Sequence, residues 1–288
     1  MVKRIITAAV CLGLLIPTLV FSDTWVFFAV MTVLAVIGVY ELCGCIGIRK
    51  QFFLSVPTYL ITIAAMVLTF YFRYKAIYLP LICFVILLFM FIEFTASMLS
   101  TGNVRFSQAG EAISFTAYIA VGFLCILLLR NLGDTGRYLY LLVFIGAWST
   151  DTGAYFAGVT LGKHKLIPEV SPNKTVEGAI GGVLGCLAGF AIYGGILSAI
   201  GNVTVHFLPL MVIGLITPVI SQIGDLIASY IKREQGIKDY GNLFPGHGGV
   251  LDRFDSILAV SQFLYAFAFL TEYFGRFTVF EVLEAVLV

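Results

Sequence analysis

The feature that most constrains this chain is its succession of apolar runs, each near the length of about 20 residues that crosses a bilayer core as a helix. The runs lie near residues 5–21, 25–45, 53–71, 77–97, 111–129, 139–159, 178–200, 206–230 and 252–272. Charged residues make up 11% of the chain, compared with about 25% in a soluble domain. The sequence therefore predicts an all-α integral membrane protein with about nine transmembrane helices, forming a single polytopic domain over residues 1–288.

Charge and terminal composition exclude several alternatives. A formal net charge of +1 argues against a surface that binds nucleic acid, so any affinity for anions must be local. The first apolar run lacks the small residues of a signal-peptide cleavage site, and we expect it to remain as the first span. The six cysteines lie in apolar runs without histidines at metal-ligand spacing, which favours a packing role.

The distribution of the 17 basic residues predicts the orientation of the spans, because Lys and Arg concentrate in cytoplasmic loops. With the N-terminus in the cytoplasm, most basic residues fall on the inner side. They are Lys3, Arg4, Arg49, Lys50, Arg105, Lys163, Lys165, Lys174, Lys232, Arg233, Lys238 and Arg253. The two longest polar loops, 160–177 and 231–251, then share the cytoplasmic face, and we expect the active site at the cytoplasmic helix ends.

Ionisable groups within the spans or at their ends are candidates for function. They are Glu41, Glu93, Asp151, Glu177, Asp225, Asp252, Arg253 and Asp255. A carboxylate at membrane depth costs on the order of 3 kcal/mol, so several unpaired ones would consume the roughly 10 kcal/mol stability of a fold. They must be paired, hydrated or bound to metal. For Glu41, Glu93 and Glu177, wetting at the membrane interface explains their presence equally well.

Three of the aspartates share a predicted depth near the cytoplasmic side. They are Asp151, Asp225 and Asp252. Asp252 and Asp255 are three residues apart in the first turn of a helix, where they share a face and the helix dipole favours negative charge. Capping explains one of them but does not explain Asp225. Carboxylates from two helices suit Mg²⁺, which keeps its other positions for water and substrate phosphates.

Two polar segments are typical of phosphate binding. The stretch "FPGHGGVLDRFD" places Gly246, Gly248 and Gly249 before a helix start, where backbone N–H groups can approach an anion; the alternative is an ordinary turn. The stretch "VSPNKTVEGAIGG" predicts a helix with Ser171 as N-cap, followed by Pro172. Lys174 would then lie in the first turn facing a phosphate, unless it is a solvated loop lysine.

Two further patterns carry structural predictions. Glycines at small-xxx-small spacing, Gly178, Gly181, Gly182, Gly185 and Gly189, predict close helix packing. The tail from residue 277 to residue 288 is expected to lie in the membrane interface as a helix with Glu281 and Glu284 on one face.

The signature of one known family carries the most specific indication of function. The stretch "SYIKREQGIKDYGNLFPGHGGVLDRFD", residues 229–255, resembles without departure the signature of the integral-membrane phosphatidate cytidylyltransferases, also called CDP-diacylglycerol synthases. The stretches "STDTGAYFAG" (149–158), "SPNKTVEG" (171–178) and "SQIGDLIASYIKR" (221–233) also resemble that family. The N-terminal spans, residues 1–130, match it only as a set of spans, and the active site is expected within 139–272.

The resemblance implies the transfer of CMP from CTP to phosphatidic acid at the bilayer, with release of pyrophosphate. It implies Mg²⁺ held by Asp225 and Asp252, with K⁺ as a candidate second ion. The expected catalytic residues are Asp225, Asp252, Lys174, Lys232 and Arg233. The expected binding residues are Lys238, Asp239, His247, Gly248, Gly249, Arg253, Asp255 and Asp151. The expected location is a bacterial inner membrane, and a homodimer is considered as the assembly.

Other classes of protein remain as alternatives. An ion-coupled transporter also buries carboxylates in broken helices, but its midplane site would not need a long cytoplasmic loop rich in Lys, Arg and Gly. The CDP-alcohol phosphotransferases would show DGxxAR, and polyprenyl-phosphate sugar transferases would show adjacent aspartates; the sequence has neither. A catalytically inactive scaffold is the remaining alternative.

Overall fold

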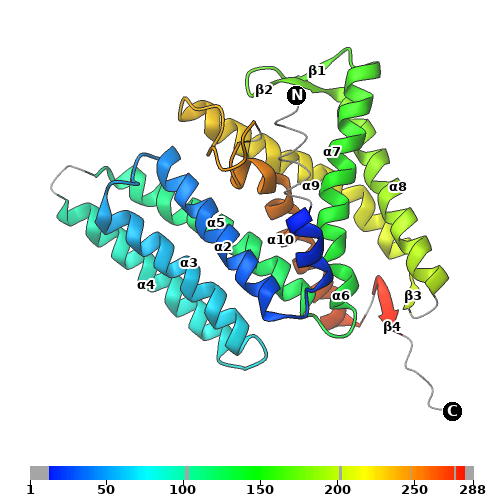
Figure 1. Ribbon diagram of the computed structural model, residues 1–288, viewed down its shortest axis with the longest axis horizontal. Helices are drawn as coiled ribbons and strands as arrows, with labels where there is room; N and C mark the ends of the chain where they lie inside the picture. The colour runs from blue at the N-terminus through cyan, green and yellow to red at the C-terminus, as the bar shows by residue number, and fades with distance from the viewer. Residues whose placement is uncertain (1–12, 101–103, 201–202, 247, 276, 283–288) are drawn as a thin grey trace. The chain divides into compact units, whose positions relative to one another are not determined.

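The computed structural model describes residues 13–100, 104–200, 203–246, 248–275 and 277–282 (Figure 1). Within these ranges it bounds nine helices and four short strands. The chain forms two compact units, each built from two segments. Unit 1 comprises residues 1–127 and 232–254, and unit 2 comprises residues 128–231 and 255–288. The expectation of a single domain remains a prediction.

Seven helices in the described part of the chain are long and apolar enough to span a membrane. They are α2 (Trp25–Cys45), α3 (Phe52–Phe72), α4 (Tyr78–Leu99), α5 (Phe106–Arg130), α8 (Val176–Ile200), α9 (Phe207–Glu234) and α10 (Leu251–Phe274). The predicted span 5–21 lies largely outside the described residues. The predicted span 139–159 forms a helix, α7 (Leu141–Leu161), but the polar stretch 149–152 interrupts its apolar run. The helical class is confirmed, and the described spans are fewer than the nine predicted.

Unit 1 joins the N-terminal helices to the loop between α9 and α10, residues 235–250, here called the signature loop, and to the first turn of α10. Helix α3 packs against both α2 and α4. A Cβ on Gly38 of α2 would lie 3.1 Å from the Leu251 side chain, and the Phe123 and Phe254 rings are 5.4 Å apart. Residues 232–254 therefore pack with the N-terminal spans, which carry no recognisable motif of their own.

Unit 2 is organised around the packing of α7 on α8, with the short helix α6 (Gly136–Leu139) before α7. Glycines allow this approach. A Cβ on Gly153 would collide with the Gly181 carbonyl oxygen, and a Cβ on Gly185 would lie 2.5 Å from the Ser149 carbonyl oxygen. The close helix packing that the glycine spacing predicts is confirmed.

Replacing Gly181 by Ala should destabilise unit 2, because the added Cβ would collide with the Cβ of Ala157 on α7. Overpacking of this kind costs about 1–3 kcal/mol. Gly195→Ala in the same helix is a matched control, since a Cβ there has no atom within 4 Å. Thermal unfolding in detergent should show a lower Tm for the first variant alone; equal Tm values would contradict the packing.

The segment before α8 differs from the prediction. Residues of β2 (Ser171–Thr175) pair antiparallel with β1 (Lys165–Ile167), so Ser171 is not the N-cap. The helix begins at Val176, and Thr175 Oγ1 accepts a hydrogen bond of 3.1 Å from the Gly178 N–H. Ser and Thr are both favoured caps, and the strand pairing selects the later one. Lys174 therefore lies in the strand, one residue before the cap.

The C-terminal segment also differs from the predicted interfacial helix. Residues of β4 (Phe280–Val282) pair antiparallel with β3 (Val203–Val205), with Glu281 opposite Thr204. Glu281 therefore lies in a strand, and Glu284 lies outside the described residues.

Candidate active site

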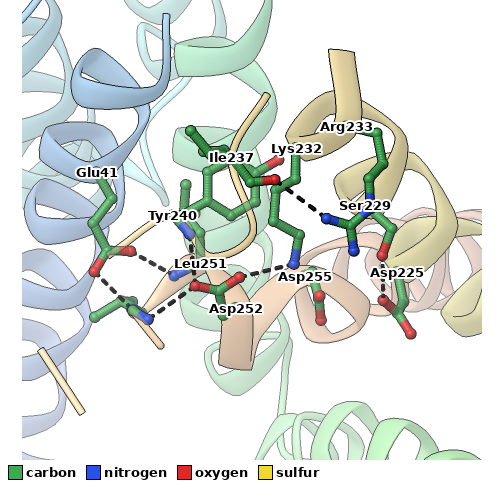
Figure 2. A network of polar contacts seen from close by, with 12 residues as sticks. Glu41, Asp225, Ser229, Lys232, Arg233, Ile237, Tyr240, Leu251, Asp252 and Asp255 are labelled. Atoms are coloured by element: carbon green, nitrogen blue, oxygen red, sulfur yellow. Dashed lines mark hydrogen bonds and ion pairs between the residues drawn. The ribbon is translucent and has the colours of Figure 1, made fainter. Parts of the chain in front are cut away.

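Asp252, the second residue of α10, is the centre of a polar network in unit 1 (Figure 2). Its Oδ1 accepts a hydrogen bond of 2.8 Å from Lys232 Nζ. Its Oδ2 accepts bonds of 2.8 Å from the Tyr240 N–H and 2.9 Å from the Gly249 N–H. The side chains of Asp252 and Lys232 are 3% and 11% exposed. A buried ion pair is stable only when further hydrogen bonds satisfy its charges, and here the loop backbone provides them.

The end of α9 directs the chain into this network. The Ile237 N–H donates to the Lys232 carbonyl at 2.9 Å, and the Gly236 N–H donates to the Arg233 carbonyl at 3.1 Å. Gly236 has a φ of +68°, so the helix ends in a Schellman motif, which needs a left-handed residue at that position. The reversal holds Lys232 in the last helical turn, with Nζ 5.3 Å from the centre of the Tyr240 ring.

Glu41 of α2 binds the start of α10 (Figure 2). Its Oε1 accepts a hydrogen bond from the Val250 N–H, and its Oε2 accepts one from the Leu251 N–H, each of 2.9 Å. Glu41 is 3% exposed, so it is buried rather than wetted at an interface. The amides of residues 249–251, which the glycine pattern assigned to a phosphate, donate here to carboxylates of the protein.

Asp225 of α9 is the centre of a second network, which lies in unit 2. Lys174 Nζ is 2.7 Å from Asp225 Oδ2, and Ser229 Oγ donates to Asp225 Oδ1 at 3.3 Å. The side chains of Lys174 and Asp225 are 24% and 30% exposed, so this pair is wetter than the pair in unit 1. Each predicted metal-binding aspartate thus has a lysine partner within its own unit.

The remaining predicted binding residues are mostly accessible. Lys238, Asp239, Arg253 and Asp151 are exposed, as is Arg233, which was predicted as a catalytic residue. Asp255 is half-buried, and its Oδ1 accepts a hydrogen bond of 2.8 Å from the Ser256 N–H. Gly248 has a φ of +84°, and His247 lies outside the described residues. Among the described residues, no group of three or more His, Cys, Asp or Glu side chains is arranged to hold a metal.

Two other glutamates, both in candidate spans, differ in their surroundings. Glu93 of α4 is fully buried, and neither carboxylate oxygen has a hydrogen-bond partner in the part of the chain that the structure describes. It is therefore not wetted at an interface. Glu177, half-buried at the start of α8, accepts from the Lys163 N–H at 3.1 Å and lies 2.6 Å from His164 Nδ1.

Comparison with known proteins identifies the family. Residues 2–271 match the cytidylyltransferase family. Over 171 residues the chain is 41% identical to the phosphatidate cytidylyltransferase of Bacillus subtilis, covering 59% of this chain and 62% of that protein. It is 38% identical over 174 residues to the Staphylococcus saprophyticus protein of the same name, covering 60% and 64%. The matches thus span less than two thirds of these two relatives.

A longer match extends the similarity into the N-terminal spans. The phosphatidate cytidylyltransferase of Staphylococcus aureus strain COL is 34% identical over 262 residues, which are 91% of this chain and 96% of that protein. The match to the family, residues 2–271, includes α2, the signature loop and most of α10. The chain belongs to the cytidylyltransferase family.

Proposed function

We propose that this chain transfers CMP from CTP to phosphatidic acid, giving CDP-diacylglycerol and pyrophosphate for phospholipid biosynthesis. Membership of the family and the names of three relatives support this reaction. The observation that carries the proposal is the buried pair of Lys232 and Asp252, which organises the signature loop around one carboxylate.

The residues suit a reaction that depends on charge neutralisation. A phosphate monoester such as phosphatidic acid is largely in its doubly ionised form at neutral pH, so its oxygen can attack the α-phosphorus of CTP without a catalytic base. The new P–O bond forms as the bond to pyrophosphate breaks. We assign the exposed Arg233, Lys238 and Arg253 to binding the anionic reactants, because transfers of this type rely on positioning and electrostatic stabilisation.

We also propose that Asp225 and Asp252 bind Mg²⁺, with K⁺ as the candidate second ion. The donor set fits a hard cation: carboxylate oxygens on both residues, and the Ser229 hydroxyl beside Asp225. A carboxylate offers about four acceptor positions, and the identified donors to Asp252 occupy three of them. When bound, the ion would supply charge stabilisation for the transferring phosphoryl group. Lys174 and Lys232 hold the two carboxylates in place.

The proposed setting is the cytoplasmic face of a bacterial inner membrane, with the N-terminus in the cytoplasm. The distribution of basic residues and the seven candidate spans support it. A site at cytoplasmic helix ends would reach CTP from water and the lipid phosphate at the headgroup plane. Asp151, Asp239, Asp255, His247 and Gly248 remain proposed binding residues, whereas the Gly249 N–H already donates to Asp252. A homodimer remains the proposed assembly.

Pyrophosphate release by the purified protein in mixed micelles tests the reaction. We expect release that requires both phosphatidic acid and CTP, and CDP-diacylglycerol as the lipid product. Controls omit the lipid or replace CTP with ATP, GTP or UTP. Folded protein that releases no pyrophosphate with any nucleotide, but carries a solute across vesicle membranes, would favour the transporter alternative.

A further inference from the structure

We infer that Glu41 is a positioning residue for the reaction, because it fixes the backbone that holds Asp252. The inference deepens the proposed function and rests on it for its catalytic part. Glu41 lies on an N-terminal span that carries no motif, 209 residues before the first amide that it binds. It therefore extends the functional machinery into the part of the chain outside the signature.

The hydrogen bonds place Glu41 at the positive end of α10. Its two oxygens accept from consecutive N–H groups, those of Val250 and Leu251. The first N–H groups of a helix have no partners within the helix, and the helix dipole favours an anion there. A carboxylate of the protein thus takes the place that a bound anion could otherwise occupy.

Two glycines leave the space for this carboxylate. A Cβ on Gly241 or on Gly249 would collide with the Glu41 carboxylate group. Neither glycine is among the residues with positive φ, so the backbone at both positions is accessible to alanine. The requirement for glycine there is one of space, and its cause is Glu41.

The same backbone connects Glu41 to Asp252. Gly249 N–H donates to Asp252 Oδ2, and the next two N–H groups donate to Glu41. Loss of Glu41 would free two adjacent amides and release the segment that orients the Asp252 carboxylate. Glu41 acts through this segment, so its loss should change turnover more than substrate affinity.

Glu41→Gln tests the catalytic part of the inference, because its NH₂ group would face one of the two N–H donors. A misplacement of about 1 Å can cost on the order of 100-fold in rate, so we expect kcat to fall by that order while KM for CTP and for phosphatidic acid changes little. Glu93→Gln is the matched control: it is a buried glutamate of the same unit whose oxygens have no hydrogen-bond partner among the described residues. Full kcat in Glu41→Gln, beside an active wild type, would overturn the inference.

Gly249→Ala tests the spatial coupling without turnover. We expect this variant to lower Tm, and we expect a smaller loss in the Glu41→Asp background, where the shorter side chain makes room for the methyl group. Contacting residues show such non-additivity. Gly110→Ala is the control, since a Cβ there has no atom within 4 Å. Equal losses of Tm in both backgrounds would overturn the coupling between Gly249 and Glu41. A wild type that is inactive but shows this coupling would reject only the proposed reaction.

Discussion

Asp252→Asn should lower turnover by about 1,000-fold or more. Asparagine keeps the size of the side chain but replaces one acceptor oxygen with an NH₂ donor. That group must face either the Lys232 ammonium or the N–H groups of Tyr240 and Gly249. Either arrangement places donor against donor and leaves the buried ammonium without its counter-charge, and breaking a buried pair costs about 3–5 kcal/mol.

Lipid-dependent pyrophosphate release measures this effect, on protein whose folding has been checked by size-exclusion chromatography and thermal unfolding. Asp134→Asn is the control, because Asp134 is an exposed residue in the connection between α5 and α6. We expect that variant to keep wild-type turnover. If folded Asp252→Asn protein retained a tenth of wild-type turnover, Asp252 would not be central to the reaction.

The helices could be predicted from the sequence because hydropathy and small-residue spacing are local properties. The apolar runs predicted the seven described spans, and the glycines of α8 predicted its packing on α7. The start of α8 was predicted wrongly because it depends on a strand pairing that local sequence patterns do not show. Ser171 and Thr175 are both favoured capping residues, and the pairing of residues 171–175 with β1 selects Thr175 although Ser is the stronger cap.

The aspartates could be predicted from their cost in a membrane, but their partners could not. Lys232 lies 20 residues from Asp252, and Lys174 lies farther from Asp225, so only the fold brings each pair together. A glycine-rich loop before a helix predicts an anion, and the pattern is the same whether that anion is a substrate phosphate or Glu41. The sequence contained one indication of a role for Glu41, which was the presence of a carboxylate in an apolar span with no partner nearby in the sequence.

The two networks neutralise their aspartates in the same way. Each aspartate is neutralised by a lysine of its own unit, at 2.8 Å for Asp252 and 2.7 Å for Asp225. The lysines offset the cost of keeping charge in an apolar surrounding. The two carboxylates differ in exposure, however, since Asp225 is 30% exposed and Asp252 is 3% exposed. Of the two carboxylates, that of Asp225 is therefore the more accessible to a cation from solution.

Removal of divalent cations should abolish turnover, and Mg²⁺ should restore it. EDTA is expected to reduce lipid-dependent pyrophosphate release by at least about 100-fold, since the remaining lysines and arginines cannot replace a cation between anionic reactants. Ser229→Ala refines the test, because the Ser229 hydroxyl donates to Asp225 Oδ1. Loss of a group that orients a metal ligand typically weakens metal affinity by about 10–100-fold.

We therefore expect Ser229→Ala to raise the Mg²⁺ concentration for half-maximal turnover by roughly 10-fold, with recovery of most of the maximal rate at saturating Mg²⁺. Thr160→Ala, which removes an exposed hydroxyl bonded to Phe156 O within α7, should leave the Mg²⁺ requirement unchanged. A Ser229→Ala variant with a lower maximal rate but an unchanged Mg²⁺ requirement would separate Asp225 from the metal. Asp225 would then pair with Lys174 without binding the metal, and the cation would have to bind to other oxygens.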